Sequence, residues 1–181
     1  MRLPILDAAS LDDAQRAARD AAIAGKRGRM PPPAEMWLYS PEMANRAQSL
    51  GEFIRFDTSL GAAMAELAIL VTARHWTSHY EWYAHKRLAL AAGLDIAIID
   101  AIRDRRDPPF TEAGPRAIYD YARALHETHG VTQAQHDAVV AAYGPRGVVE
   151  VVGVCGYYTL VSMTLNAFVV ELPEGETSEL A

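Results

Sequence analysis

The sequence predicts an all-α protein, and the evidence is the spacing of its apolar residues and its helix-boundary signals. Alanine is abundant, and apolar residues recur at steps of three and four. Capping residues, glycines and prolines divide the chain into segments of ordinary helix length. With 181 residues, the chain lies in the range of one domain with a sizeable core. We therefore expect one domain over residues 1–181, comprising an N-terminal helix and strap (1–35), a core (36–172) and a tail (173–181).

The N-terminal part is predicted to contain one helix and a strap. Ser10 is suited to cap a helix over about residues 11–24, and Gly25 is suited to end it. Residues 26–39 include the consecutive prolines Pro31–Pro33, which are poorly compatible with a regular helix. We expect this stretch to be extended and to pack its apolar residues against the core.

The middle of the chain is predicted to form four helices. Ser40 followed by Pro41 is a strong helix start, and this helix should run to about residue 56. Apolar residues at helical spacing predict the other three helices over about 60–74, 77–92 and 96–103. Gly93 is a natural terminator, and Asp95 is suited to cap the last of these helices.

The C-terminal part is predicted to form three more helices, over about 111–128, 133–143 and 146–171. Thr132 is suited to cap the second, and Gly144–Pro145 should separate it from the third. The third begins with a β-branched run, Val148–Cys155, that also suits a buried strand. We predict a helix, because every neighbouring segment appears helical and a lone strand would lack a partner. The acidic tail after Pro173 is expected to be frayed.

Composition limits the classes of function. The net charge of −6 argues against a nucleic-acid partner or an anionic membrane, and the short basic cluster Lys26–Arg29 suggests a solvated loop. No uninterrupted apolar stretch approaches the length of a membrane helix, and residues 1–13 do not resemble a secretory signal. The single cysteine, Cys155, excludes an intrachain disulfide and a CxxC redox pair. We expect a cytoplasmic protein.

Three titratable residues mark the candidate site. On a helix over 77–92, Ser78, Glu81, Trp82 and His85 share one face, and Glu66 opens the preceding helix. Glu81 and His85 are four residues apart, so the carboxylate could orient the imidazole and favour its protonated form. The alternative is a purely structural pair that ties two helices together. An acid at Glu66 would also suit the dipole of its own helix.

Several short motifs resemble the carboxymuconolactone decarboxylase-like family, which also contains the alkylhydroperoxidase-D-type (AhpD-like) proteins. They span roughly residues 35 to 170, and their order and spacing carry the resemblance: Ser40–Ala44, Thr58–Leu60, Glu66–Leu70, Ala73–Trp76, Tyr80–His85, Ala92–Leu94, Gly156–Tyr158 and Leu165–Phe168. The resemblance implies a helical bundle of the AhpD-like type that assembles as trimers or hexamers.

The resemblance also implies which residues act. In the peroxidase branch, a glutamate, a CxxC pair and a histidine form the site, and these positions correspond here to Glu66, Ser78, Glu81 and His85. Ser78 and Glu81 replace both cysteines, so thiol peroxidase activity should not carry over. The chain therefore resembles the cysteine-free members. A small unsaturated carboxylic acid or lactone is the expected substrate, without a cofactor.

The expected roles follow from side-chain chemistry. Decarboxylation leaves electron density that a proton must quench, so His85 would act as general acid or base with Glu81 and Glu66 as partners. Arg74 would anchor a carboxylate, although an interhelical salt bridge is an alternative role. The other predicted substrate-binding residues are Ser78, Trp82, Tyr157 and Asn166.

Two other hypotheses remain open beside the decarboxylase-like enzyme. The fold could serve as a non-catalytic oligomer that binds a small molecule or acts as a scaffold. Thiol-dependent peroxide reduction would have to depend on Cys155 alone. A metal site formed by His75, His79, Glu81 and His85 is not expected, because no HExxH pattern occurs.

Overall fold

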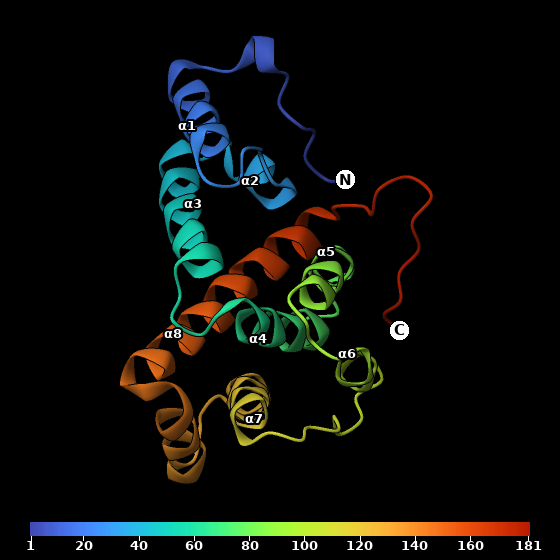
Figure 1. Cartoon of the computed structure of the whole chain (residues 1–181). Coiled ribbons are helices and arrows are strands. Elements are labelled where there is room, and N and C mark those ends of the chain that lie inside the picture. The colour runs from blue at the N-terminus through green and yellow to red at the C-terminus, as the bar shows by residue number, and fades with distance from the viewer.

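The computed structural model describes residues 1–181 and contains helices but no strands (Figure 1). A 3-10 turn, η1, precedes eight α-helices. Their bounds are η1 Ala8–Ser10, α1 Asp13–Ala24, α2 Pro32–Trp37, α3 Pro41–Phe56, α4 Ala62–His75, α5 His79–Ala91, α6 Ile96–Arg103, α7 Ala113–Glu127 and α8 Gln133–Phe168. The predicted all-α class is confirmed.

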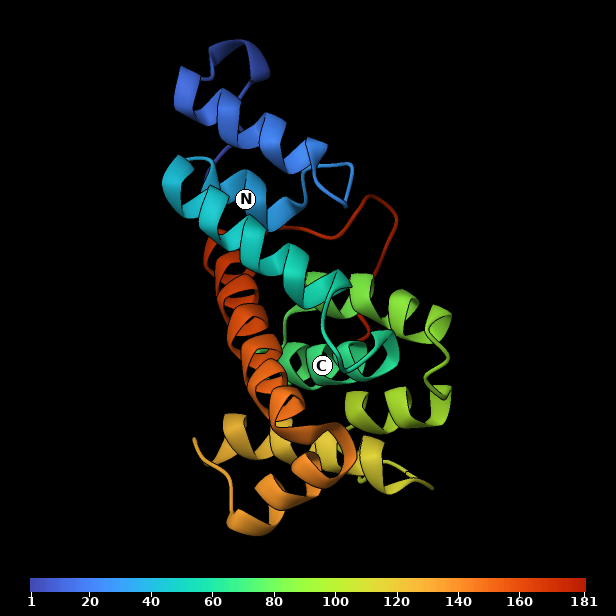
Figure 2. The ribbon, with the colours of Figure 1, turned by 60° about the vertical axis from the view of Figure 1, so that its left-hand side comes forward.

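The helix α8 is the axis of the molecule (Figures 1 and 2). The helices α2, α3, α4 and α7 all pack against it, whereas α5 packs mainly against α4. α8 bends at Gly144, whose φ of 70° is not helical, immediately before Pro145. α8 therefore consists of two helical segments that meet where the boundary between two helices was predicted, and the β-branched run after the kink is helical.

The buried face of α8 holds the core together. Val151, Val154 and Val161 are almost fully buried, and the indole of Trp37 on α2 donates a hydrogen bond of 2.9 Å to Thr164. By length and composition α8 could cross a membrane, but 61% of its most apolar window is buried inside the fold. Its hydropathy is therefore accounted for by packing against neighbouring helices.

Two features of the N-terminal part differ from expectation. Asp12, rather than Ser10, caps α1, because its carboxylate accepts from the Gln15 amide while the Gln15 side chain accepts from the Asp12 amide. The strap contains the short helix α2, so the prediction of a wholly extended segment is wrong. Pro32 occupies the first turn of α2, where a missing amide hydrogen has no cost.

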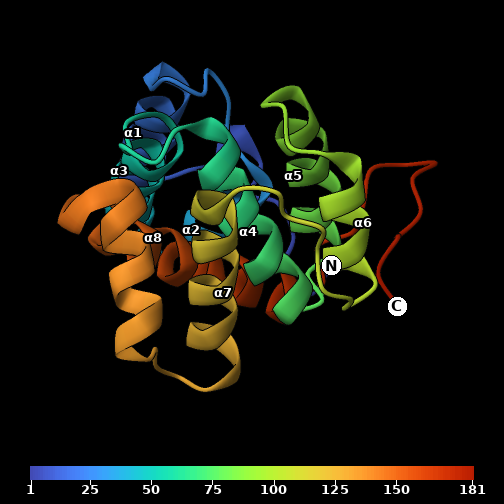
Figure 3. The same cartoon turned by 60° about the horizontal axis from the view of Figure 1, so that its bottom comes forward.

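The tail is anchored to α5 by side-chain contacts instead of fraying, and Figure 3 shows it as a loop on the side of the molecule where α6 lies. Glu176 accepts hydrogen bonds from Tyr83 and Arg87, and Glu179 accepts one from Lys86 at 2.6 Å. Leu180 is buried in the core. Composition alone could not predict that the tail is anchored, because its acidic residues pair with basic residues on a helix some 90 residues earlier in the chain.

Candidate active site

A histidine held between two carboxylates lies where α4 and α5 meet. Nδ1 of His85 is 2.6 Å from Oε2 of Glu66, and Nε2 is 3.1 Å from Oε2 of Glu81. Glu66 comes from α4, whereas Glu81 and His85 lie one turn apart on α5. All three side chains are buried. The structure thus brings together the three titratable residues that mark the candidate site in the sequence, with Glu66 in contact with His85.

The two carboxylates determine the charge of the imidazole. Burial by itself would lower the pKa of His85, but the negative charges of Glu66 and Glu81, together with the hydrogen bond to Glu66, raise it to about 9. His85 is thus an imidazolium at neutral pH. Arg55 adds a further positive charge, with its guanidinium 3.9 Å from Oε1 of Glu66.

The two sides of the imidazole are not equivalent. The Glu66 contact is a short hydrogen bond, whereas Oε2 of Glu81 is buried and lacks a hydrogen bond of good geometry despite its closeness to Nε2. The Tyr158 ring packs edge-on against His85, with ring centroids 4.9 Å apart. Glu66 and Tyr158 therefore fix the ring, while its Nε2 side retains the capacity to bind another group.

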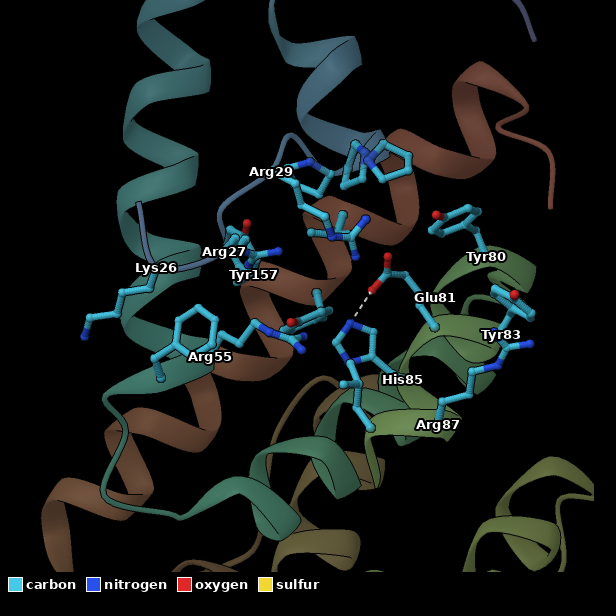
Figure 4. Close-up of a pocket in the computed structure, with 18 residues that line it drawn as sticks. Lys26, Arg27, Arg29, Arg55, Tyr80, Glu81, Tyr83, His85, Arg87 and Tyr157 are labelled. Atoms are coloured by element: carbon cyan, nitrogen blue, oxygen red, sulfur yellow. Dashed lines mark ion pairs between the residues drawn. The ribbon is translucent and has the colours of Figure 1, made fainter. Parts of the chain in front are cut away.

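That side faces a cavity of about 590 Å³ between the strap, α3, α5 and α8 (Figure 4). Glu81 and His85 line it, together with aromatic and basic side chains. The aromatic residues are Phe56, Tyr80, Tyr83, Tyr157 and Tyr158, and the basic ones are Lys26, Arg27, Arg29, Arg55 and Arg87. A cavity with aromatic walls and convergent cations suits a flat organic anion.

Three of the basic side chains interact with tyrosine side chains of the cavity wall. Burial raises the pKa of Tyr157 to about 12 against the lowering effect of Arg27, and it raises the pKa of Tyr80 against that of Arg29. The guanidinium of Arg87 lies over the Tyr83 ring, 4.0 Å from its centroid. Both phenol groups, Tyr80 and Tyr157, thus remain protonated and neutral at physiological pH.

Of the predicted substrate-binding residues, only Tyr157 lines this cavity. Arg74 lies elsewhere, donating hydrogen bonds to the backbone oxygens of Arg103 and Ala181, so the structure corrects its expected role as an anchor here. Asn166 is also displaced, because its amide donates to the Trp76 carbonyl. Both residues tie segments of the chain together.

Ser78 and Trp82 also lie outside the cavity. Ser78 is fully buried at the start of α5, and its hydroxyl has no hydrogen-bond partner. Trp82 belongs to the core, and its indole is 3.5 Å from a Glu179 carboxylate oxygen in the tail. Ser78, Glu81, Trp82 and His85 are all buried at the start and on one side of α5, but only Glu81 and His85 line the cavity.

Sequence reasoning missed Arg27, Arg29 and Arg55. The cluster Lys26–Arg29 is a largely exposed loop, as expected, but its basic side chains also form one wall of the cavity. The prolines that follow it were the available signal, since Pro31 and Pro32 line the same wall and hold the segment against the body of the protein. Cys155 lies outside the cavity, and burial raises the pKa of its thiol to about 12.

Comparisons with known proteins place this geometry in a known fold. No protein-family model and no curated protein matches the sequence. An uncharacterized peroxidase-related protein from Silicibacter sp. TM1040 superposes with a TM-score of 0.77 at 15% identity, over 99% of this chain and 94% of that one. An alkylhydroperoxidase AhpD core protein from Ralstonia eutropha JMP134 gives 0.76 at 16% identity, over 96% and 92%.

A third solved structure comes from a protein with a named activity. It is a cysteine-to-alanine variant of the debrominase Bmp8 in complex with 2,3,4-tribromopyrrole. The TM-score is 0.70 at 13% identity, over 96% of this chain and 90% of that one. The chain therefore has the AhpD-core fold over nearly its whole length, as the sequence motifs implied.

Proposed function

We propose that this protein is a decarboxylase-like enzyme that performs acid–base chemistry on a small unsaturated carboxylic acid or lactone. The observation that carries the proposal is His85, whose two ring nitrogens lie beside Glu66 and Glu81 in the wall of a cationic, aromatic cavity. The Bmp8 complex supports a flat ligand, because a protein of the same fold binds a small halogenated pyrrole.

The chemistry requires only a proton and an environment that accepts charge. The carbon–carbon bond to the carboxylate breaks, carbon dioxide leaves, and the electron pair remains on the unsaturated framework. Arginine side chains stabilise that negative charge, and His85 delivers a proton from Nε2 to the carbon that lost the carboxylate. Glu66 keeps the ring oriented throughout, and a proton from solvent restores the imidazolium at Nε2 before the next turnover.

The test is a screen of unsaturated carboxylic acids and lactones in D₂O, followed by NMR. Turnover should release carbon dioxide. For each molecule of carbon dioxide released, one deuterium should appear on the carbon that lost the carboxylate. Replacing Cys155 with alanine should leave this rate unchanged, because its buried thiol is protonated and does not line the cavity. A hydroperoxide reduction that requires Cys155 would contradict the proposal.

A second candidate function is non-catalytic binding of a small molecule. It is favoured by one observation, which is that both imidazole nitrogens already lie beside carboxylates, as in a purely structural ion pair. An organic acid that binds stoichiometrically, raises the melting temperature and is recovered unchanged would support this function over the first.

We also propose that the protein self-associates as a trimer or hexamer. Val149, Val152 and Met163 form an exposed apolar stripe on α8, and Gly153 and Gly156 leave open space between them. Such a stripe suits close packing of a second copy. Sedimentation velocity at micromolar concentration should give an oligomer that Val149→Asp weakens, and a monomeric wild type would refute this.

A further inference from the structure

The walls of the cavity contain more positive charge than their own acids neutralise. Lys26 is paired with Asp57, its Nζ 2.7 Å from Oδ2, and Arg87 is paired with Glu176 at 2.7 Å. These two cations are therefore already compensated by acids of the protein itself.

The centre of the site is also neutral as a whole. Glu66 and Glu81 supply two negative charges, and the imidazolium of His85 together with Arg55 supplies two positive charges. A ligand would thus meet no net charge from this group of four side chains.

Arg27 and Arg29 are different, because neither forms an ion pair. The guanidinium of Arg27 donates a hydrogen bond to the Gly51 carbonyl and also interacts with the Tyr157 hydroxyl, but its Nε is buried without a partner. Arg29 makes no hydrogen bond to the protein at all. Both residues line the cavity across from Glu81 and His85 (Figure 4).

We infer that Arg27 and Arg29 of the strap are the specificity-determining residues of this site, and that they select a ligand with two negative charges, such as a planar dicarboxylate. This inference rests on the proposed function for its location. A buried guanidinium nitrogen without a partner is costly, and a carboxylate that accepts from it removes that cost. Two uncompensated cations in one cavity favour a dianion over a monoanion of the same shape.

The segment that carries these arginines is suited to the task. Arg27 and Arg29 flank Gly28, whose φ of 66° turns the chain between them. Pro31 begins the next turn, and Pro32 and Pro33 begin α2, which is tied to α8 through Trp37. Prolines restrict the backbone, so less conformational freedom is lost when the arginines bind a ligand.

The experiment measures binding to pairs of probes that differ only in charge. Phthalate, isophthalate and terephthalate are each compared with the corresponding monoamide by calorimetry at low, constant ionic strength. At least one isomer should bind about tenfold more tightly as the dianion than as the monoamide. Arg27→Gln and Arg29→Gln should each reduce this preference severalfold, whereas Arg46→Gln, which removes an exposed arginine on α3, should leave it unchanged.

The outcomes separate this inference from the proposed function. If no isomer is preferred as the dianion, or if the preference survives in both strap variants, the assignment of Arg27 and Arg29 is overturned, even when turnover dependent on His85 is found. If the dianion preference holds but no acid or lactone is ever converted, the charge selection stands and the decarboxylase-like chemistry fails. Circular dichroism establishes that each variant is folded.

Discussion

Replacing His85 with glutamine is expected to lower kcat/KM for decarboxylation by roughly 10²- to 10⁴-fold, the usual contribution of a positioned general acid. Glutamine keeps a hydrogen-bond donor for Glu66 but cannot carry a proton to the substrate. The measurement is the initial rate of carbon dioxide release with the substrate found by the D₂O screen.

A matched control is His126→Gln, which changes another partly buried histidine outside the cavity. His126 bonds to Thr72, and burial and the neighbouring His75 lower its pKa to about 4, so it is neutral at physiological pH. Its replacement should leave kcat/KM unchanged. Turnover at the wild-type rate in a folded His85→Gln protein would remove His85 from the mechanism.

Stability is expected to fall as the pH rises from about 6.5 to 9 and above. The pKa of His85 is raised in the folded protein, so its stabilising contribution is fully present below the unfolded value of 6.5 and is lost as the pH passes about 9. A pKa of about 9 against 6.5 corresponds to about 3 kcal/mol. Urea denaturation at pH 6 and pH 10 measures the difference.

The same comparison in His85→Gln isolates the contribution of this residue. The variant should be less stable at pH 6, because Glu66 and Glu81 lose the cation between them, and the alkaline loss should shrink. His126 does not interfere, since its lowered pKa makes its contribution change on the acid side, below 6.5. An equal alkaline loss in both proteins would show that other groups cause it.

The helices and the closeness of Glu81 to His85 could be predicted from the sequence, for a local reason. The helix α6 and the extent of α3 followed from caps and prolines adjacent in the chain, and the Glu81–His85 pair from helical periodicity. These features depend on residues a few positions apart. Family spacing marked Glu66 as a candidate, but its contact with His85 depends on how α4 and α5 cross, and only the structure shows that.

The remaining parts of the site depend on contacts between distant segments. Arg27 faces His85 only because the strap folds back over α5 and α8, and Arg74 is occupied because Arg103 and the last residue of the chain reach it. Neither event has a signature in local sequence. The basic cluster and the acidic tail could be recognised in the sequence, but the residues that they contact could not.

His85 is a cation at neutral pH because two carboxylates hold it in the cavity wall. An NMR titration of the ring nitrogens in ¹⁵N-histidine-labelled protein tests this charge state most directly, with the resonance of His85 assigned by its loss in His85→Gln. We expect both nitrogens to be protonated at pH 7 and the ring to titrate near pH 9. A neutral ring at pH 7, with titration at or below 6.5, would contradict it.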